Sequence, residues 1–138
     1  MNRLTFQRLA EERLVDARAL AQAERFAAAY YLAGYAVECA LKACICRMTS
    51  QHDFPPKEAK DLYIHDLAKL ATKIDEIPGV DWRKELDSNS QLRQNWLLTK
   101  DWREDARYRS KTEREALDLI SAIEDDPDGV LACLRKHW

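Results

Sequence analysis

The feature that most constrains this chain is the apolar stretch between Ala29 and Arg47. Wound as a helix, it is apolar on nearly every side, and such a helix belongs at the centre of a helical bundle. The stretch is too short and too charged to span a membrane, which takes about 20 mostly apolar residues. It carries Glu38 and Lys42 four residues apart, a spacing that places both side chains on one helix face. We therefore predict a central bundle helix that bears one polar pair.

The rest of the chain predicts further helices around this central one. Its 138 residues are 46% hydrophobic, with three glycines and four prolines, a composition that suits a single helical domain over residues 1–138. Apolar periodicity predicts helices over residues 3–23, 26–49 and 81–101, the last interrupted near residues 88–90, and a further helix within residues 57–77. A final helix begins near Lys111 and is split where Asp126 can cap a new start at Pro127. No segment alternates as a strand does, so we predict an all-α fold.

Single residues add expectations about local structure. Thr5 is the predicted N-cap of the first helix. Glycine inside a helix lowers its stability by about 1 kcal/mol relative to alanine, so Gly34 indicates a close helix–helix approach. His65 and Asp66 allow two interpretations. They form an acid–base dyad, or Asp66 caps a helix that begins at Leu67 while His65 packs at its start; we favour the cap.

Charge and cysteine content limit the classes of function. Lys and Arg number 22 against 24 Asp and Glu, a net charge of −2 that excludes a globally basic nucleic-acid-binding protein but allows a local basic patch. Arginines at positions 3, 8 and 13 interrupt any apolar leader, and the cysteines form no C-x-x-C pair, so we expect a cytoplasmic protein with buried free thiols. The histidines share no metal-ligand spacing and the cysteines do not complement them, so we predict no metal site and no cofactor.

Four segments of the chain, in order, resemble the HEPN domain, the family of higher eukaryote and prokaryote nucleotide-binding proteins. They are residues 30–43 of the central helix, His65-Asp66-Leu67 ahead of a helix, Trp102 with Arg107-Tyr108 ahead of the final helix, and a terminal helix over residues 130–138. The resemblance spans most of the chain and implies an antiparallel, up-and-down bundle of four to five helices, usually a homodimer. It also implies a setting in prokaryotic RNA- and nucleotide-handling systems, often beside a nucleotidyltransferase-type partner protein in toxin–antitoxin modules.

Many HEPN proteins are metal-independent endoribonucleases that use an arginine and a histidine separated by four to six residues. The histidine transfers protons at the ribose, and the arginine stabilises phosphate charge. Where the resemblance places this motif, no histidine follows Arg103 or Arg107 at an allowed spacing. Arg47 and His52 have such a spacing, but they lie at the end of the central helix. The enzyme hypothesis is therefore an endoribonuclease with Arg47 and His52 as catalytic residues; the alternative is a helix-ending arginine and a loop histidine.

The hypothesis we favour is a non-catalytic or catalytically divergent member of the family with a ligand site. Residues 93–114 include seven Lys or Arg against four acids, interleaved with Trp96, Trp102 and Tyr108, and arginine beside aromatic rings suits phosphate contact and base stacking. The alternative is a solvated helix face with two core tryptophans. With the resemblance, the ligand-contact candidates are Glu38, Lys42, Arg103, Arg107, Tyr108 and Arg109.

Glu38 and Lys42 form either the polar floor of the ligand groove or a structural pair, because buried charges need partners. We therefore predict a HEPN-like domain that binds nucleotide, RNA or a partner protein in a toxin–antitoxin or defence-type system. A purely structural helical interaction module is a further alternative. No membrane partner is expected.

Overall fold

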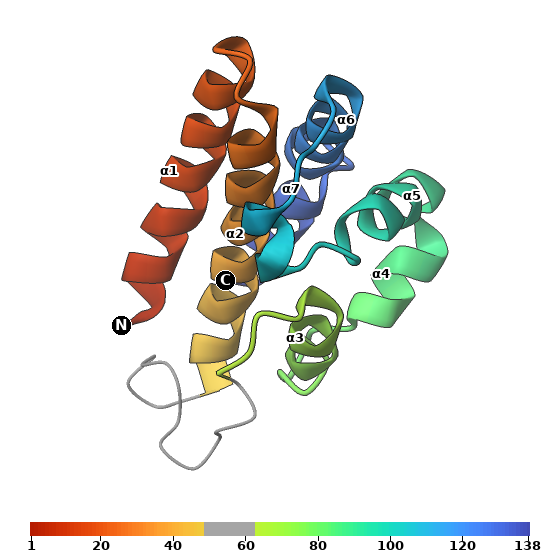
Figure 1. Ribbon diagram of the computed structural model, residues 1–138. Coiled ribbons are helices and arrows are strands. Elements are labelled where there is room, and N and C mark those ends of the chain that lie inside the picture. The colour runs from red at the N-terminus through yellow and green to blue at the C-terminus, as the bar shows by residue number, and fades with distance from the viewer. Residues whose placement is uncertain (49–62) are drawn as a thin grey trace.

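The computed structural model describes residues 1–48 and 63–138, which form an all-α bundle (Figure 1). The helices are α1 (Arg3–Gln22), α2 (Phe26–Ile45), α3 (Leu67–Ile74), α4 (Trp82–Ser88), α5 (Ser90–Thr99), α6 (Glu113–Glu124) and α7 (Val130–Arg135), with 3-10 helices η1 (Cys46–Met48) and η3 (Glu104–Tyr108). These two parts of the chain contain no β-strand, which confirms the predicted fold class. No helix within them is long and apolar enough to cross a membrane.

α2 is the central helix, as its composition predicts. Every residue from Val37 to Ile45 is buried. α1 runs beside α2 in the opposite direction, and α3, α6, α7 and η3 also contact α2 (Figure 1). The face that α1 turns toward the core consists of Phe6, Ala10, Leu14 and Ala17, at the spacing of an amphipathic helix.

Side-chain caps set the helix starts. Asn2 Oδ1 accepts the Thr5 backbone N–H at 3.0 Å, so the N-cap of α1 is Asn2, whereas Thr5 was the predicted cap. Asp66 caps α3 as predicted, because its Oδ1 accepts the Lys69 N–H at 3.1 Å. Asn89 caps α5 and separates it from α4, at the predicted interruption.

The break between α6 and α7 lies where predicted, but α7 starts later than expected. Its N-cap is Gly129, so the helix begins at Val130 and not at Pro127. The physical reason is a turn, closed by the Gly129 N–H bonded to the Asp125 carbonyl at 2.9 Å. After this turn α7 packs against α2, α5 and α6.

Gly34 marks a close approach within the core, but the neighbour is a side chain and not another helix backbone. A Cβ at position 34 would lie within 3.0 Å of the Trp102 indole, so only glycine leaves room for the ring. Trp102 is 1% exposed and stacks on Tyr31, in the preceding turn of α2, with ring centroids 5.9 Å apart. This packing holds the segment that leads into η3 against α2.

Candidate functional site

The polar pair of α2 belongs to a chain of contacts that runs from the core to the surface. Glu38 is buried, and its Oε1 accepts a hydrogen bond from Lys42 Nζ at 2.8 Å. The same oxygen lies 2.9 Å from His65 Nδ1. His65 is partly exposed, and its Nε2 lies 3.2 Å from Glu104 Oε2. The contacts therefore join α2, the segment before α3 and η3, which are distant in sequence.

His65 does not form a dyad with Asp66. Its two ring nitrogens face Glu38 and Glu104, while Asp66 caps α3 and lies 3.7 Å from Arg103 Nη1. Because both nitrogens are directed at protein carboxylates, the geometry supports a role for His65 in positioning η3. Direct contact of Glu38 or Lys42 with a ligand stays a prediction.

The thiols are buried, as predicted, and all four cysteines are free. Burial, helped at Cys39 by the Glu38 carboxylate, raises the pKa of Cys39 to about 12, and burial raises that of Cys44 to about 12. A thiol with so high a pKa keeps its proton near neutral pH and is a poor nucleophile. The cysteines of α2 are therefore unsuited to covalent catalysis.

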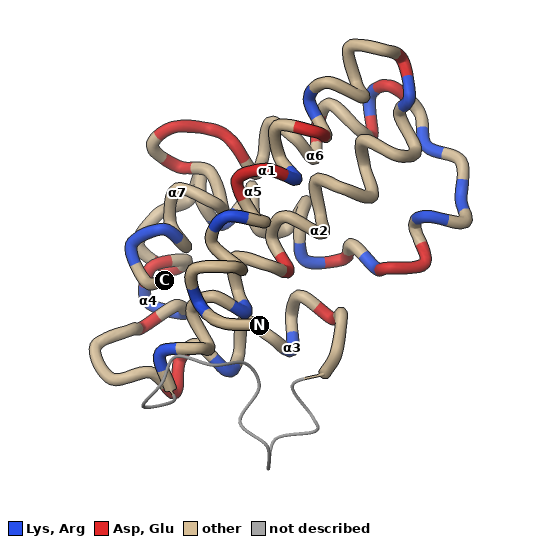
Figure 2. The backbone as a smooth tube through the Cα atoms, turned by 90° about the vertical axis from the view of Figure 1, so that its left-hand side faces the viewer, with Lys and Arg blue, Asp and Glu red and all other residues tan. Residues whose placement is uncertain are grey.

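Most cations in the basic segment are paired within the fold. The pairs are Lys100–Asp101, Arg103–Asp66, Arg109–Asp105, Lys111–Glu115 and Arg114–Asp118, with N···O separations of 3.1 to 3.7 Å. Figure 2 shows the same intermixing of the two signs along the backbone. These carboxylates offset the positive charge that the sequence alone predicts for this surface.

Arg107, like Arg93, has no carboxylate of the described residues within ion-pair distance. Its guanidinium lies 4.8 Å from the centroid of the Tyr108 ring. Interaction with Tyr108, through charge and a hydrogen bond, raises the pKa of Arg107, and a hydrogen bond to Tyr31 adds to the effect. Tyr108 is 76% exposed, so a cation and an aromatic ring face solvent together. This pair can contact a phosphate and stack a base.

The two tryptophans of residues 93–114, Trp96 and Trp102, are core residues. This agrees with the alternative interpretation of that segment, a solvated helix face with two core tryptophans. Trp96 meets Trp82 edge-on, with ring centroids 5.1 Å apart and an interplanar angle of 85°. Trp102 is packed over Gly34. Tyr108 is therefore the aromatic residue of this segment that is open to a ligand.

Cavity size indicates what kind of ligand fits. A cavity of about 150 Å³ beside η3 is lined by Tyr30, Asp101, Arg103, Asp105, Ala106, Arg109 and Lys111. Small-molecule pockets are typically about 300–1,000 Å³, so this cavity is too small to enclose a nucleotide. A cavity of about 400 Å³ between α1, α6 and α7 is lined by four carboxylates and by two arginines that are already ion-paired, an environment unfavourable for phosphate.

The predicted ribonuclease pair lies only partly within the described residues. Arg47 belongs to η1, and its Nη1 donates a hydrogen bond to the His137 carbonyl at 2.9 Å. His52 lies outside the described residues, so its relation to Arg47 stays a prediction. The contact that is present gives Arg47 a role in holding the turn after α7.

Two residues of this region were not predicted from sequence. Tyr31 supports both Trp102 and Arg107, and the only sequence feature that points to it is its spacing of one turn from Gly34. Glu104 meets His65 only through the tertiary fold, and no sequence pattern connects the two.

Comparisons of the chain with protein-family models, with curated proteins and with solved structures give no match. Function is therefore inferred from the geometry of Arg107, Tyr108 and the residues that hold them.

Proposed function

We propose that this chain is a HEPN-like domain that binds single-stranded RNA in a prokaryotic toxin–antitoxin or defence-type system. The observation that carries the proposal is the Arg107 guanidinium 4.8 Å from the centre of the exposed Tyr108 ring. The planar guanidinium suits phosphate contact, and stacking of a base on an aromatic side chain contributes about 1–3 kcal/mol. The pair thus offers one contact for the backbone and one for a base.

An extended single strand of RNA suits this surface better than a free nucleotide does. The cavity beside η3, about 150 Å³, cannot enclose a nucleotide, whereas Tyr108 is open to a base presented from outside. Because the neighbouring cations are paired with carboxylates, few phosphates are neutralised on binding. Each neutralised phosphate of a single strand adds about 0.7 to the salt slope, which is the fall in the logarithm of the binding constant per unit of log salt concentration. We therefore expect the affinity to depend only weakly on salt.

The contacts of Glu104 and the packing of Trp102 support the proposal by holding η3 in place before any ligand binds. Glu104, at the start of η3, is tied through His65 to Glu38, and Trp102 is packed over Gly34. A preorganised surface loses less conformational entropy on binding. The polar pair of α2 therefore supports the proposed RNA-binding surface from the core beneath it.

Fluorescence anisotropy of a labelled single-stranded RNA, with ATP and GTP as competitors, tests the proposal. Tyr108→Ala is expected to weaken binding roughly tenfold through the lost stacking, whereas Tyr108→Phe keeps most of the affinity. Arg107→Ala is expected to weaken binding and to lower the salt slope by about 0.7. The matched control is Arg114→Ala, which removes the same charge from a side chain that is 90% exposed and should have little effect.

Several results would contradict this function. Absence of binding to RNA, ATP and GTP would remove it, and equal losses in Arg107→Ala and Arg114→Ala would reduce it to non-specific attraction. RNA cleavage in EDTA that His52→Ala abolishes would instead support the endoribonuclease hypothesis. A stable complex with a neighbouring gene's product and no RNA affinity would support an interaction module.

The homodimer and the nucleotidyltransferase-type partner stay predictions. Light scattering would measure the first, and co-expression would test the second.

A further inference from the structure

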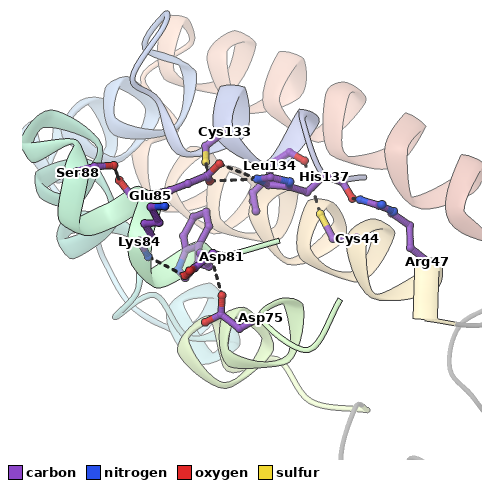
Figure 3. A network of polar contacts seen from close by, with 11 residues as sticks. Cys44, Arg47, Asp75, Asp81, Lys84, Glu85, Ser88, Cys133, Leu134 and His137 are labelled. Carbon is purple, nitrogen blue, oxygen red and sulfur yellow. Dashed lines mark hydrogen bonds and ion pairs between the residues drawn. The ribbon is translucent and has the colours of Figure 1, made fainter. Parts of the chain in front are cut away.

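Away from η3, three potential metal ligands converge between α4 and α7 (Figure 3). Cys133 Sγ of α7 lies 2.8 Å from Glu85 Oε2 of α4. His137 Nε2 lies 3.0 Å from Glu85 Oε1 and 3.1 Å from Glu85 Oε2. One ligand atom from each residue lies within 4.8 Å of the other two. A sulfur, a nitrogen and an oxygen donor therefore face one point.

The local sequence explains how two of these donors meet. Cys133 lies in the last turn of α7, and His137 lies four residues later in the turn that follows the helix. The turn after α7 is held by the His137 N–H bonded to the Leu134 carbonyl at 2.9 Å and by Arg47, which binds the His137 carbonyl. Cys44 Sγ donates to the Leu134 carbonyl at 3.6 Å. Contacts from the end of α2 and from η1 thus hold the backbone that carries His137.

We propose that Glu85, Cys133 and His137 bind a divalent transition metal of the zinc class, with water as the fourth ligand. Donors at about 2.0–2.3 Å around a tetrahedral zinc lie roughly 3.3–3.7 Å apart, so the present positions need shifts of no more than about 1 Å. Thiolate and imidazole donors favour zinc-like ions over Mg²⁺ and Ca²⁺, which take oxygen ligands. The Glu85 side chain is 31% exposed and that of His137 12%, which leaves an approach for the ion and for water.

The Cys133 thiol donates a hydrogen bond to Glu85 Oε2, so a proton lies between the sulfur and the carboxylate. Zinc binds a thiolate, so on binding the thiol proton leaves to solvent and the ion takes its place between sulfur and carboxylate. The bound ion would clamp α4 to α7.

Titration of the tag-free, EDTA-treated and dialysed full chain with Zn²⁺ in a calorimeter tests the proposal. We expect one Zn²⁺ per chain and a rise in Tm with added zinc. Co²⁺ is the spectroscopic probe, because coordination by Cys133 gives a thiolate-to-cobalt charge-transfer absorption. Cys133→Ser should abolish that absorption, and His137→Gln and Glu85→Gln should each weaken Zn²⁺ binding by more than about tenfold.

Two matched controls separate this cluster from other thiols and histidines. Cys39→Ser removes another buried thiol, and His65→Gln removes another histidine that contacts carboxylates. Both controls should bind Zn²⁺ as the unmodified chain does. If Cys133→Ser fails to fold, the partly exposed His137 still decides the question through His137→Gln. Absence of Zn²⁺ binding would show a hydrogen-bonded triad only, and binding that survives His137→Gln unchanged would overturn the assignment. RNA binding should be unaffected by Cys133→Ser, His137→Gln and Glu85→Gln, which lie away from η3.

Discussion

Gly34→Ala tests whether the fold depends on the space that α2 leaves for Trp102. The added Cβ would lie within 3.0 Å of the indole, a separation that Cβ atoms in proteins do not show. The ring would have to retreat by roughly 1.5 Å to reach an ordinary contact distance of about 3.5–4.0 Å. Retreat is opposed because Trp102 is almost fully buried and Tyr31 stacks on it.

Two contributions to the free energy of unfolding oppose each other in this variant. Alanine is favoured over glycine inside a helix by about 1 kcal/mol. Insertion of an extra carbon into a well-packed core typically costs about 1–3 kcal/mol. Because the Trp102 ring is buried and stacked on Tyr31, we expect the packing cost to exceed the gain in helix propensity. The expected net loss in the free energy of unfolding is about 1–2 kcal/mol. That loss corresponds to a fall in Tm of roughly 3–8 °C for a chain of this size.

Urea denaturation followed by tryptophan fluorescence and far-UV circular dichroism measures this loss. The matched control is the double variant Gly34→Ala/Trp102→Phe, in which the smaller ring leaves room for the methyl group. Its loss should be smaller than the sum of the two single losses. Gly34→Ala should also weaken RNA binding, because Trp102 holds the segment that enters η3. An unchanged or increased free energy of unfolding for Gly34→Ala would refute the reasoning.

Glu38→Leu removes the acceptor shared by Lys42 and His65, and urea denaturation should show a loss of about 3 kcal/mol. Lys42→Met leaves Glu38 its contact with His65 and should cost less; equal losses would contradict the shared role of Glu38. Thr112→Ala removes the capping box of α6 and should cost about 1 kcal/mol, while Thr112→Ser keeps most of the stability. Hydrogen bonds from Thr112 lower the pKa of Glu115 from 4.5, so its contribution is present above that pH and is lost as the pH falls through the lowered folded-state pKa. The Tm difference between the unmodified chain and Thr112→Ala should therefore shrink in acid, and a constant difference from roughly pH 6 to pH 3 would argue against it.

The helical class and the central place of α2 could be predicted because they follow from apolar composition, which acts along the whole segment. The helix starts were harder, since a single side chain decides each one. Asp66 was identified as a cap, whereas Asn2 took the place expected for Thr5. The start of α7 depended on a turn over residues 125–129, which no periodicity reveals.

The residues of the candidate site could be identified from the sequence, but the pairing of the neighbouring cations with carboxylates could not. Arg107 and Tyr108 stand out in sequence, but their exposure depends on the packing of Trp102 and on the neighbours of η3. The pairing of Arg103 with Asp66 joins segments that only the fold brings together. The same limit applies to the proposed metal site, which was not predicted from the sequence: Cys133 and His137 are four residues apart, but only the fold brings Glu85 beside them.

Photo-crosslinking to single-stranded RNA that carries 4-thiouridine tests the central claim most directly, because it reports which residue touches a base. Mass spectrometry of the digested product should place the main crosslink on the peptide that contains Tyr108, and Arg107→Ala should reduce its yield while Arg114→Ala leaves it unchanged. Crosslinks concentrated on α1 or α7, or an unchanged yield in Arg107→Ala, would contradict the proposal that this exposed pair binds RNA.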